Sequence, residues 1–166
     1  MAKRKRRTPD SENKLRLYTT KPDALEDALA TGKDAQWLET YFGEATYQEL
    51  TQLAQQAKQR KKRGGPRVLI LPGIMGSTIG QPGTLWDDVI WFDPKDIALG
   101  NLVELALTSH QSPYRSLGVV PIAYTVLKLR LTSAGYDVDY HHYDWRQSLD
   151  KLGNELVSRL KQERAH

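Results

Sequence analysis

The chain has 166 residues, a formal net charge of +4, no cysteine, and 39% hydrophobic against 27% charged residues. This length is enough for one domain with a buried core, and the lack of cysteine excludes disulfides and cysteine-ligated metal sites. No window approaches the ~18 consecutive apolar residues of a membrane span, and the basic N-terminus lacks the apolar stretch of a secretory signal. We therefore expect a cytoplasmic protein without a cofactor or a bound metal.

Two short basic runs, residues 3–7 and 58–63, carry much of the positive charge. Such runs can contact an anionic membrane surface or nucleic acid. Nucleic-acid sites commonly interleave aromatic side chains with the charges, and neither run has them, so nucleic acid is the less expected partner. We interpret the runs as a solvated tail and linker. A non-catalytic interaction module that binds anionic lipid or nucleic acid through these runs is the alternative function.

The N-terminal third divides into a polar tail and a helical segment. Residues 1–20 are charged and lack periodicity, which predicts a disordered basic tail. Residues 21–63 place apolar side chains such as Leu25 and Leu29 at helical spacing, which predicts helices. A Gly-Gly-Pro sequence then predicts a boundary, so that residues 64–166 form a second unit.

The second unit alternates predicted strands with predicted helices. An aliphatic run at residues 68–71 and the segment 137–142 are typical of buried strands. Asp93 followed by Pro94 predicts a helix start, and further helices are expected from Pro121 and near the C-terminus. Helices between strands favour an α/β fold with a mostly parallel sheet between two helical layers.

The loop after the first predicted strand is the strongest candidate site. It begins at Pro72, and its tip is formed by Gly73, Ile74 and Met75. Open α/β sheets bind ligands at the carboxyl ends of their strands. Backbone N–H groups of such a loop can also point at a substrate oxygen, which makes the loop a candidate oxyanion hole. An ordinary strand-ending turn is the alternative interpretation.

Three motifs together resemble the lecithin:cholesterol acyltransferase-like group of the α/β-hydrolase superfamily. They are the Pro-Gly loop at residues 72–77, Trp91-Phe92-Asp93 at a helix start, and Tyr143-Asp144-Trp145-Arg146 after a strand. Their order and spacing agree with the family. The resemblance covers the chain from about Arg67 and none of residues 1–66. It implies a partial α/β-hydrolase fold, preceded by the helical segment.

The same resemblance implies that the catalytic residues are not in this chain. The family uses a serine on a strand-to-helix elbow, with aspartate and histidine later in the chain. No Gly-x-Ser-x-Gly sequence is present, and the nearest imitation has Thr78 at its centre. The serine, aspartate and histidine are therefore expected beyond His166. The resemblance thus implies that this chain is the N-terminal part of a lipid O-acyltransferase or lipase, truncated before the elbow. We expect this part to be inactive alone, and its intact relative to use a lipid ester.

For the residues that are present, the resemblance implies roles around the loop. Gly73, Ile74 and Met75 would form the oxyanion loop, with Ile74 donating its backbone N–H. A structural role near the rim of the site is implied for Tyr143, Asp144, Trp145 and Arg146. Within that group, Asp144 and Arg146 could pair with each other or hold neighbouring loops.

Three aromatic residues could form an apolar lid or acyl-binding surface, with core packing as the alternative: Trp86, Trp91 and Phe92. Ser77 is interpreted as a loop residue that bonds to backbone rather than as a nucleophile. His141 and His142 would point to opposite faces of a strand, which makes them a poor pair of metal ligands.

Overall fold

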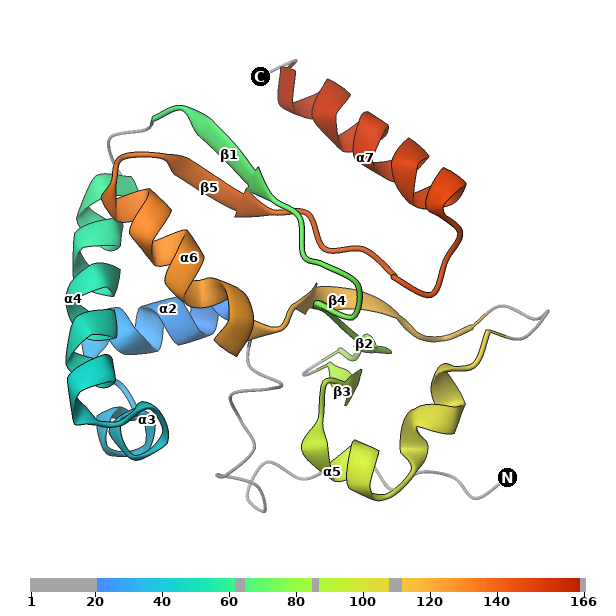
Figure 1. The fold of residues 1–166 in the computed structure, drawn as a ribbon, viewed down its shortest axis with the longest axis horizontal. Helices are drawn as coiled ribbons and strands as arrows, with labels where there is room; N and C mark the ends of the chain where they lie inside the picture. Colours follow the sequence, from blue (N-terminus) through green and yellow to red (C-terminus); the bar gives the residue numbers. More distant parts are fainter. Residues whose placement is uncertain (1–20, 62–64, 85–86, 108–111, 165–166) are drawn as a thin grey trace.

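The computed structural model describes residues 21–61, 65–84, 87–107 and 112–164, and its mixed α/β class agrees with the prediction (Figure 1). The helices are α2 (Pro22–Thr31), α3 (Ala35–Phe42), α4 (Glu44–Lys61), α5 (Pro94–Ala98), α6 (Pro121–Ser133) and α7 (Leu149–Arg164), with the 3₁₀ helix η1 (Asn101–Leu105) after α5. The strands are β1 (Arg67–Ile70), β2 (Ser77–Gln81), β3 (Asp88–Trp91), β4 (Arg115–Val119) and β5 (Asp137–Tyr140). The predicted tail, residues 1–20, lies outside the described residues.

The strands form two separate sheets, so the prediction of one mostly parallel sheet was wrong. β1 and β5 pair in parallel, with Arg67 opposite Asp137 and Ile70 opposite Tyr140. β2 lies between β3 and β4 in an antiparallel sheet. The sequence reading missed this second sheet because its strands are short and lack a clear alternating pattern. A complete α/β-hydrolase fold stays a prediction.

The parallel pair lies between α6 and α7. Val138 is buried and Tyr140 lies under the Lys128 Nζ of α6, 4.8 Å from the ring centre. Asp139, which points to the opposite face of the strand, pairs with Arg159 of α7. Helices therefore lie on both faces of this pair, which has only two described strands.

The main apolar core joins the N-terminal helices to α6. Its buried side chains come from four helices and are Leu25, Leu29, Leu38, Leu50, Ala54, Ala57 and Leu129. Beside it, the buried Nζ of Lys128 lies 2.7 Å from Glu26 and 3.1 Å from Asp23. The helical segment 21–61 thus packs directly on the α/β unit, across the boundary that the Gly-Gly-Pro sequence predicted.

Candidate functional site

The loop from Pro72 to Gly76 leaves the carboxyl end of β1 and turns into β2. The Gly76 N–H donates to the Gly73 carbonyl at 2.9 Å, and Met75 adopts a left-handed conformation with φ of 63°. Ile74 is 79% exposed at the tip. The turn therefore presents its central residues outward while both ends stay attached to strands.

Three carbonyl oxygens of this loop are bonded to donors from the surrounding structure. Pro72 O accepts from Tyr143 Oη at 2.8 Å, and Met75 O accepts from Trp91 Nε1 at 2.7 Å. Gly76 O accepts from the Val120 N–H at 2.8 Å. These bonds come from three separate parts of the chain, so the direction of the carbonyl groups is determined by tertiary contacts.

The amide groups of the loop are arranged differently. The Gly73 N–H donates to Tyr124 Oη at 2.9 Å. The N–H groups of Ile74 and Met75 have no hydrogen-bond acceptor among the described residues. Two consecutive backbone donors at an exposed tip, with the carbonyls bonded elsewhere, can stabilise a negatively charged oxygen.

Tyr124 of α6 was not predicted as part of this site. Besides accepting from Gly73, its hydroxyl lies so close to Gly76 that a Cβ built on Gly76 would be 2.4 Å from Tyr124 Oη. Glycine is therefore needed at position 76 for close approach. No sequence signal linked Tyr124 to the loop, because the two are 51 residues apart and meet only through the packing of α6.

The segment Tyr143 to Arg146 lies against the same loop. Besides the bond from its hydroxyl to Pro72 O, Tyr143 donates its N–H to the Oγ of Ser77, the first residue of β2, at 3.1 Å. Trp145 Nε1 donates to the Ser77 carbonyl at 3.1 Å. Ser77 itself is fully buried, which makes it a structural residue of β2 and inaccessible as a nucleophile.

Arg146 connects this segment to two further loops. It forms a bidentate pair with Asp144, at 2.8 and 2.7 Å, and donates to the carbonyls of Leu105 and Tyr114 at 3.0 and 2.9 Å. Its side chain is only 5% exposed. Partial burial by itself would raise the pKa of Asp144, but hydrogen bonds from Arg146 outweigh that effect and hold the pKa below its ordinary value. The pair is therefore charged at neutral pH. Through Arg146 it joins its own segment to the backbone at Leu105 and Tyr114.

The aromatic residues near the loop pack against one another. Trp91 contacts Phe92 and Trp145 edge to face, with ring centres 5.1 and 5.8 Å apart. Trp91 and Trp145 also pack on the buried cluster of Ile79, Ile90 and Leu105. These contacts and the hydrogen bond to Met75 O thus explain the position of the Trp91 side chain. Trp86 lies outside the described residues.

The two adjacent histidines do not form a metal site with each other. His142 Nδ1 lies 2.8 Å from Ser116 Oγ of β4, whereas the charges of Arg159 and Glu155 act on His141. Among the described residues no carboxylate is hydrogen-bonded to His142, and Asp139 acts on it through its charge, so the Ser–His contact lacks the third member of a triad. In the described part of the chain, no group of three His, Asp or Glu side chains is placed to hold a metal ion.

The basic run at residues 58–63 is described only in part. Lys58 pairs with Asp27 of α2 at 2.9 Å, and both side chains are largely exposed. The other run, residues 3–7, lies outside the described residues.

Comparison with protein-family models, with curated proteins and with solved structures gives no match. Within the described residues, no helix combines the length and the apolar character needed to cross a membrane.

Proposed function

We propose that this chain supplies the oxyanion-stabilising part of a serine-dependent acyl-transfer site that acts on a lipid ester. The observation that carries the proposal is the asymmetry of the loop: the amides of Ile74 and Met75 lack a described acceptor, while the neighbouring carbonyls accept from Tyr143, Trp91 and Val120. The motifs shared with the lecithin:cholesterol acyltransferase-like α/β-hydrolases support the same assignment.

In the proposed reaction a serine from outside the described residues attacks the ester carbonyl carbon. The carbonyl oxygen then gains negative charge, and the N–H groups of Ile74 and Met75 stabilise it. Each such donor typically contributes about 100- to 1000-fold in rate, because it is oriented before the charge develops. Collapse of the intermediate expels the alcohol and leaves an acyl-enzyme, which water or a second alcohol cleaves.

The side chains around the loop suit an acyl chain. Ile74 and Met75 expose apolar surface, and Leu71 at the base of the loop is also exposed. Trp91 lies next to this surface, because its Nε1 donates to Met75 O, and the Phe92 ring packs on Trp91. An apolar rim beside backbone donors is the combination that a lipid ester requires.

The first experiment titrates ¹⁵N-labelled protein with hexylphosphonate, whose tetrahedral anion resembles the intermediate. We expect the amide signals of Ile74 and Met75 to shift together and to saturate. Ile74→Pro, which removes one donor, should weaken binding at least 10-fold, whereas Ile74→Val, which keeps the N–H, should change it less than 2-fold. Shifts elsewhere in the chain with none at these two amides would contradict the proposal.

The second experiment measures hydrolysis of p-nitrophenyl butyrate by the purified chain. Because no described serine is part of a triad, we expect no serine-dependent hydrolysis above background. If a fluorophosphonate labels a serine among the described residues and hydrolysis is lost on labelling, the proposal that the catalytic serine lies outside these residues is wrong.

A further inference from the structure

Tyr124 places a hydroxyl group directly beside the candidate oxyanion loop. Its Oη accepts from the Gly73 N–H at 2.9 Å. The next amide along the chain is that of Ile74, one of the two amides without a described acceptor. Because consecutive Cα atoms are about 3.8 Å apart, the hydroxyl lies within about one residue of the proposed oxyanion donors.

The hydroxyl proton of Tyr124 has no acceptor among the described residues. A phenol has one proton to donate and can accept as well. The Gly73 N–H occupies an acceptor position of Oη, and Oη donates to no described group. The other tyrosine at the loop differs, because Tyr143 donates its proton to Pro72 O at 2.8 Å. Within the described structure, Tyr124 can therefore donate to a ligand, whereas the proton of Tyr143 is already used.

The helix that carries Tyr124 is held firmly on its other side. Tyr124 lies in the first half of α6, which packs on the N-terminal helices through the buried Leu129. One turn further along α6, Lys128 pairs with Glu26 of α2 at 2.7 Å. The hydroxyl is therefore positioned before any ligand binds. A donor that is oriented in advance is the kind that stabilises a developing negative charge.

The loop approaches this hydroxyl closely because it has glycines at both ends of the turn. A Cβ built on Gly76 would be 2.4 Å from Tyr124 Oη, and one built on Gly73 would be 3.9 Å from it. Gly73 and the two residues after it are exposed, and Tyr124 beside them is half-buried. The hydroxyl thus lies against the same exposed turn that carries the amides of Ile74 and Met75.

We propose that the Tyr124 hydroxyl is a third donor of the oxyanion site, beside the amides of Ile74 and Met75. It donates a hydrogen bond to the negatively charged oxygen of the tetrahedral intermediate and keeps its proton, so no bond forms or breaks at the tyrosine. The bond that Oη accepts from Gly73 makes it a stronger donor, because linked hydrogen bonds polarise one another. This inference rests on the proposed function and adds to it a catalytic side chain.

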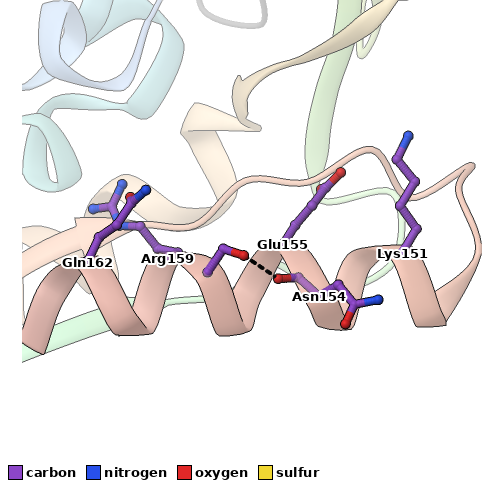
Figure 2. Close-up of a pocket in the computed structure, with 6 residues that line it drawn as sticks. Lys151, Asn154, Glu155, Arg159 and Gln162 are labelled. Atoms are coloured by element: carbon purple, nitrogen blue, oxygen red, sulfur yellow. Dashed lines mark hydrogen bonds between the residues drawn. The ribbon is translucent and has the colours of Figure 1, made fainter.

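The polar hollow along α7 does not compete with the loop as a site for this charge. Figure 2 shows the hollow, of about 660 Å³, lined from one helix by Lys151, Asn154, Glu155, Ser158, Arg159 and Gln162. Arg159 is already paired with Asp139 and Glu163. The Ser158 hydroxyl donates to the Asn154 carbonyl. The amides of α7 therefore serve as a reference for non-specific binding of an anion.

The test follows hexylphosphonate binding to the whole chain, labelled with ¹⁵N and with ¹³C at the Cζ of tyrosine, whose shift reports the hydrogen bonding of the phenol. We expect the Tyr124 Cζ signal, identified by its loss in Tyr124→Phe, to move with the Ile74 and Met75 amides and to give the same dissociation constant. The Tyr143 Cζ signal should stay in place, because that hydroxyl donates to Pro72 O. A purely structural role of Tyr124 would leave both Cζ signals unchanged.

The affinity for hexylphosphonate gives a second measurement. Tyr124→Phe should bind it at least 10-fold more weakly, because a hydrogen bond to a charged oxygen is lost. Tyr136→Phe, at a tyrosine 41% exposed beyond the other end of α6, is the matched control and should change the affinity less than 2-fold.

Two results would each overturn the inference and leave the proposed function intact. One is a shift of the Ile74 and Met75 amides with no movement of the Tyr124 Cζ signal. The other is binding by Tyr124→Phe that is as tight as that of the parent chain. If those two amides do not shift, or if shifts are confined to α7, the proposed function is wrong and the third donor fails with it.

Discussion

Around Leu29 and Leu129 the chain is held together by apolar side chains from several helices, whereas around the loop at residues 72–77 it is held by polar side chains that bond to backbone. Apolar packing is non-directional and stabilises the region as a whole. Hydrogen bonds to carbonyl groups are directional, so they determine how the loop faces solvent. The comparison separates residues that stabilise the fold from residues that orient the candidate site.

The two regions also differ in how they bury charge. In the helical region Lys128 pairs with Glu26 and Asp23, side chain to side chain. Near the loop, Arg146 divides its donors between Asp144 and two backbone carbonyls. Removing either cation leaves unpaired groups, but only the loss of Arg146 frees backbone segments next to the candidate site.

The largest effect is expected in the helical core. Leu129→Ala should lower the free energy of unfolding by about 3 kcal/mol, because it removes a fully buried side chain and leaves a cavity. Urea denaturation followed by circular dichroism measures it. Leu127→Ala is the control on the same helix, where the side chain is 47% exposed, and about 0.5 kcal/mol or less is expected there. Equal losses would contradict the placement of the core.

A similar loss is expected from Arg146→Met, about 3 kcal/mol, since it leaves Asp144 unpaired in a mostly buried position. Arg159→Met is the comparison, because Arg159 is about one-third exposed and such pairs contribute at most about 1 kcal/mol. The measurement is again urea denaturation. If Arg146→Met costs no more than Arg159→Met, the bracing role of Arg146 is wrong.

The helical region should also lose stability at high pH. Burial alone would lower the pKa of Lys128, but Glu26 and Asp23 outweigh it and the pKa lies above 10.5. Burial and the Glu26 charge raise the pKa of Tyr140 above its ordinary value of 10.0. Both groups keep their protons in the folded chain where the unfolded chain loses them. Their contribution to the free energy of unfolding is therefore complete below about pH 10 and is lost as the pH rises further.

We accordingly expect the melting temperature to fall above pH 10, and Lys128→Met to flatten the fall without abolishing it, since Tyr140 remains. Lys58→Met is the matched control, because Lys58 forms an exposed pair with Asp27 and should leave the slope unchanged. If the melting temperature of Lys128→Met falls with pH as steeply as that of the parent chain, this cluster does not cause the loss of stability above pH 10.

The smallest effect on stability is expected at the loop itself. Tyr143→Phe removes the bond to Pro72 O and should cost about 1 kcal/mol. Its clearer effect should be local, with amide exchange in the loop at least 3-fold faster while exchange in α6 stays unchanged. Tyr136→Phe, at a tyrosine that is 41% exposed, is the control. Unchanged loop exchange in Tyr143→Phe would argue against orientation of the loop by this hydroxyl.

Much of the local structure followed from sequence patterns. The aliphatic run broken at Pro72 and Gly73 predicted β1 and its loop, and Asp93 before Pro94 predicted the start of α5, where the Asp93 side chain accepts from the N–H groups of Lys95 and Asp96. These features depend on neighbouring residues alone. The antiparallel sheet did not follow, because its strands depend on partners: β2 pairs with β4, whose residues lie 35 to 42 positions further along the chain.

By itself, the sequence determined where helices and β1 lie, that a tight loop ends β1, and which motifs accompany the loop. The tertiary structure decided which atoms the loop offers to solvent. Trp91 and Tyr143 reach the loop from distant parts of the chain and bond to its carbonyls, and Tyr124 accepts from the Gly73 N–H, while the Ile74 and Met75 amides keep no described acceptor. The physical reason is that periodicity and turn chemistry act over a few residues, whereas hydrogen-bond partners far apart in sequence are chosen by the packing that brings them together.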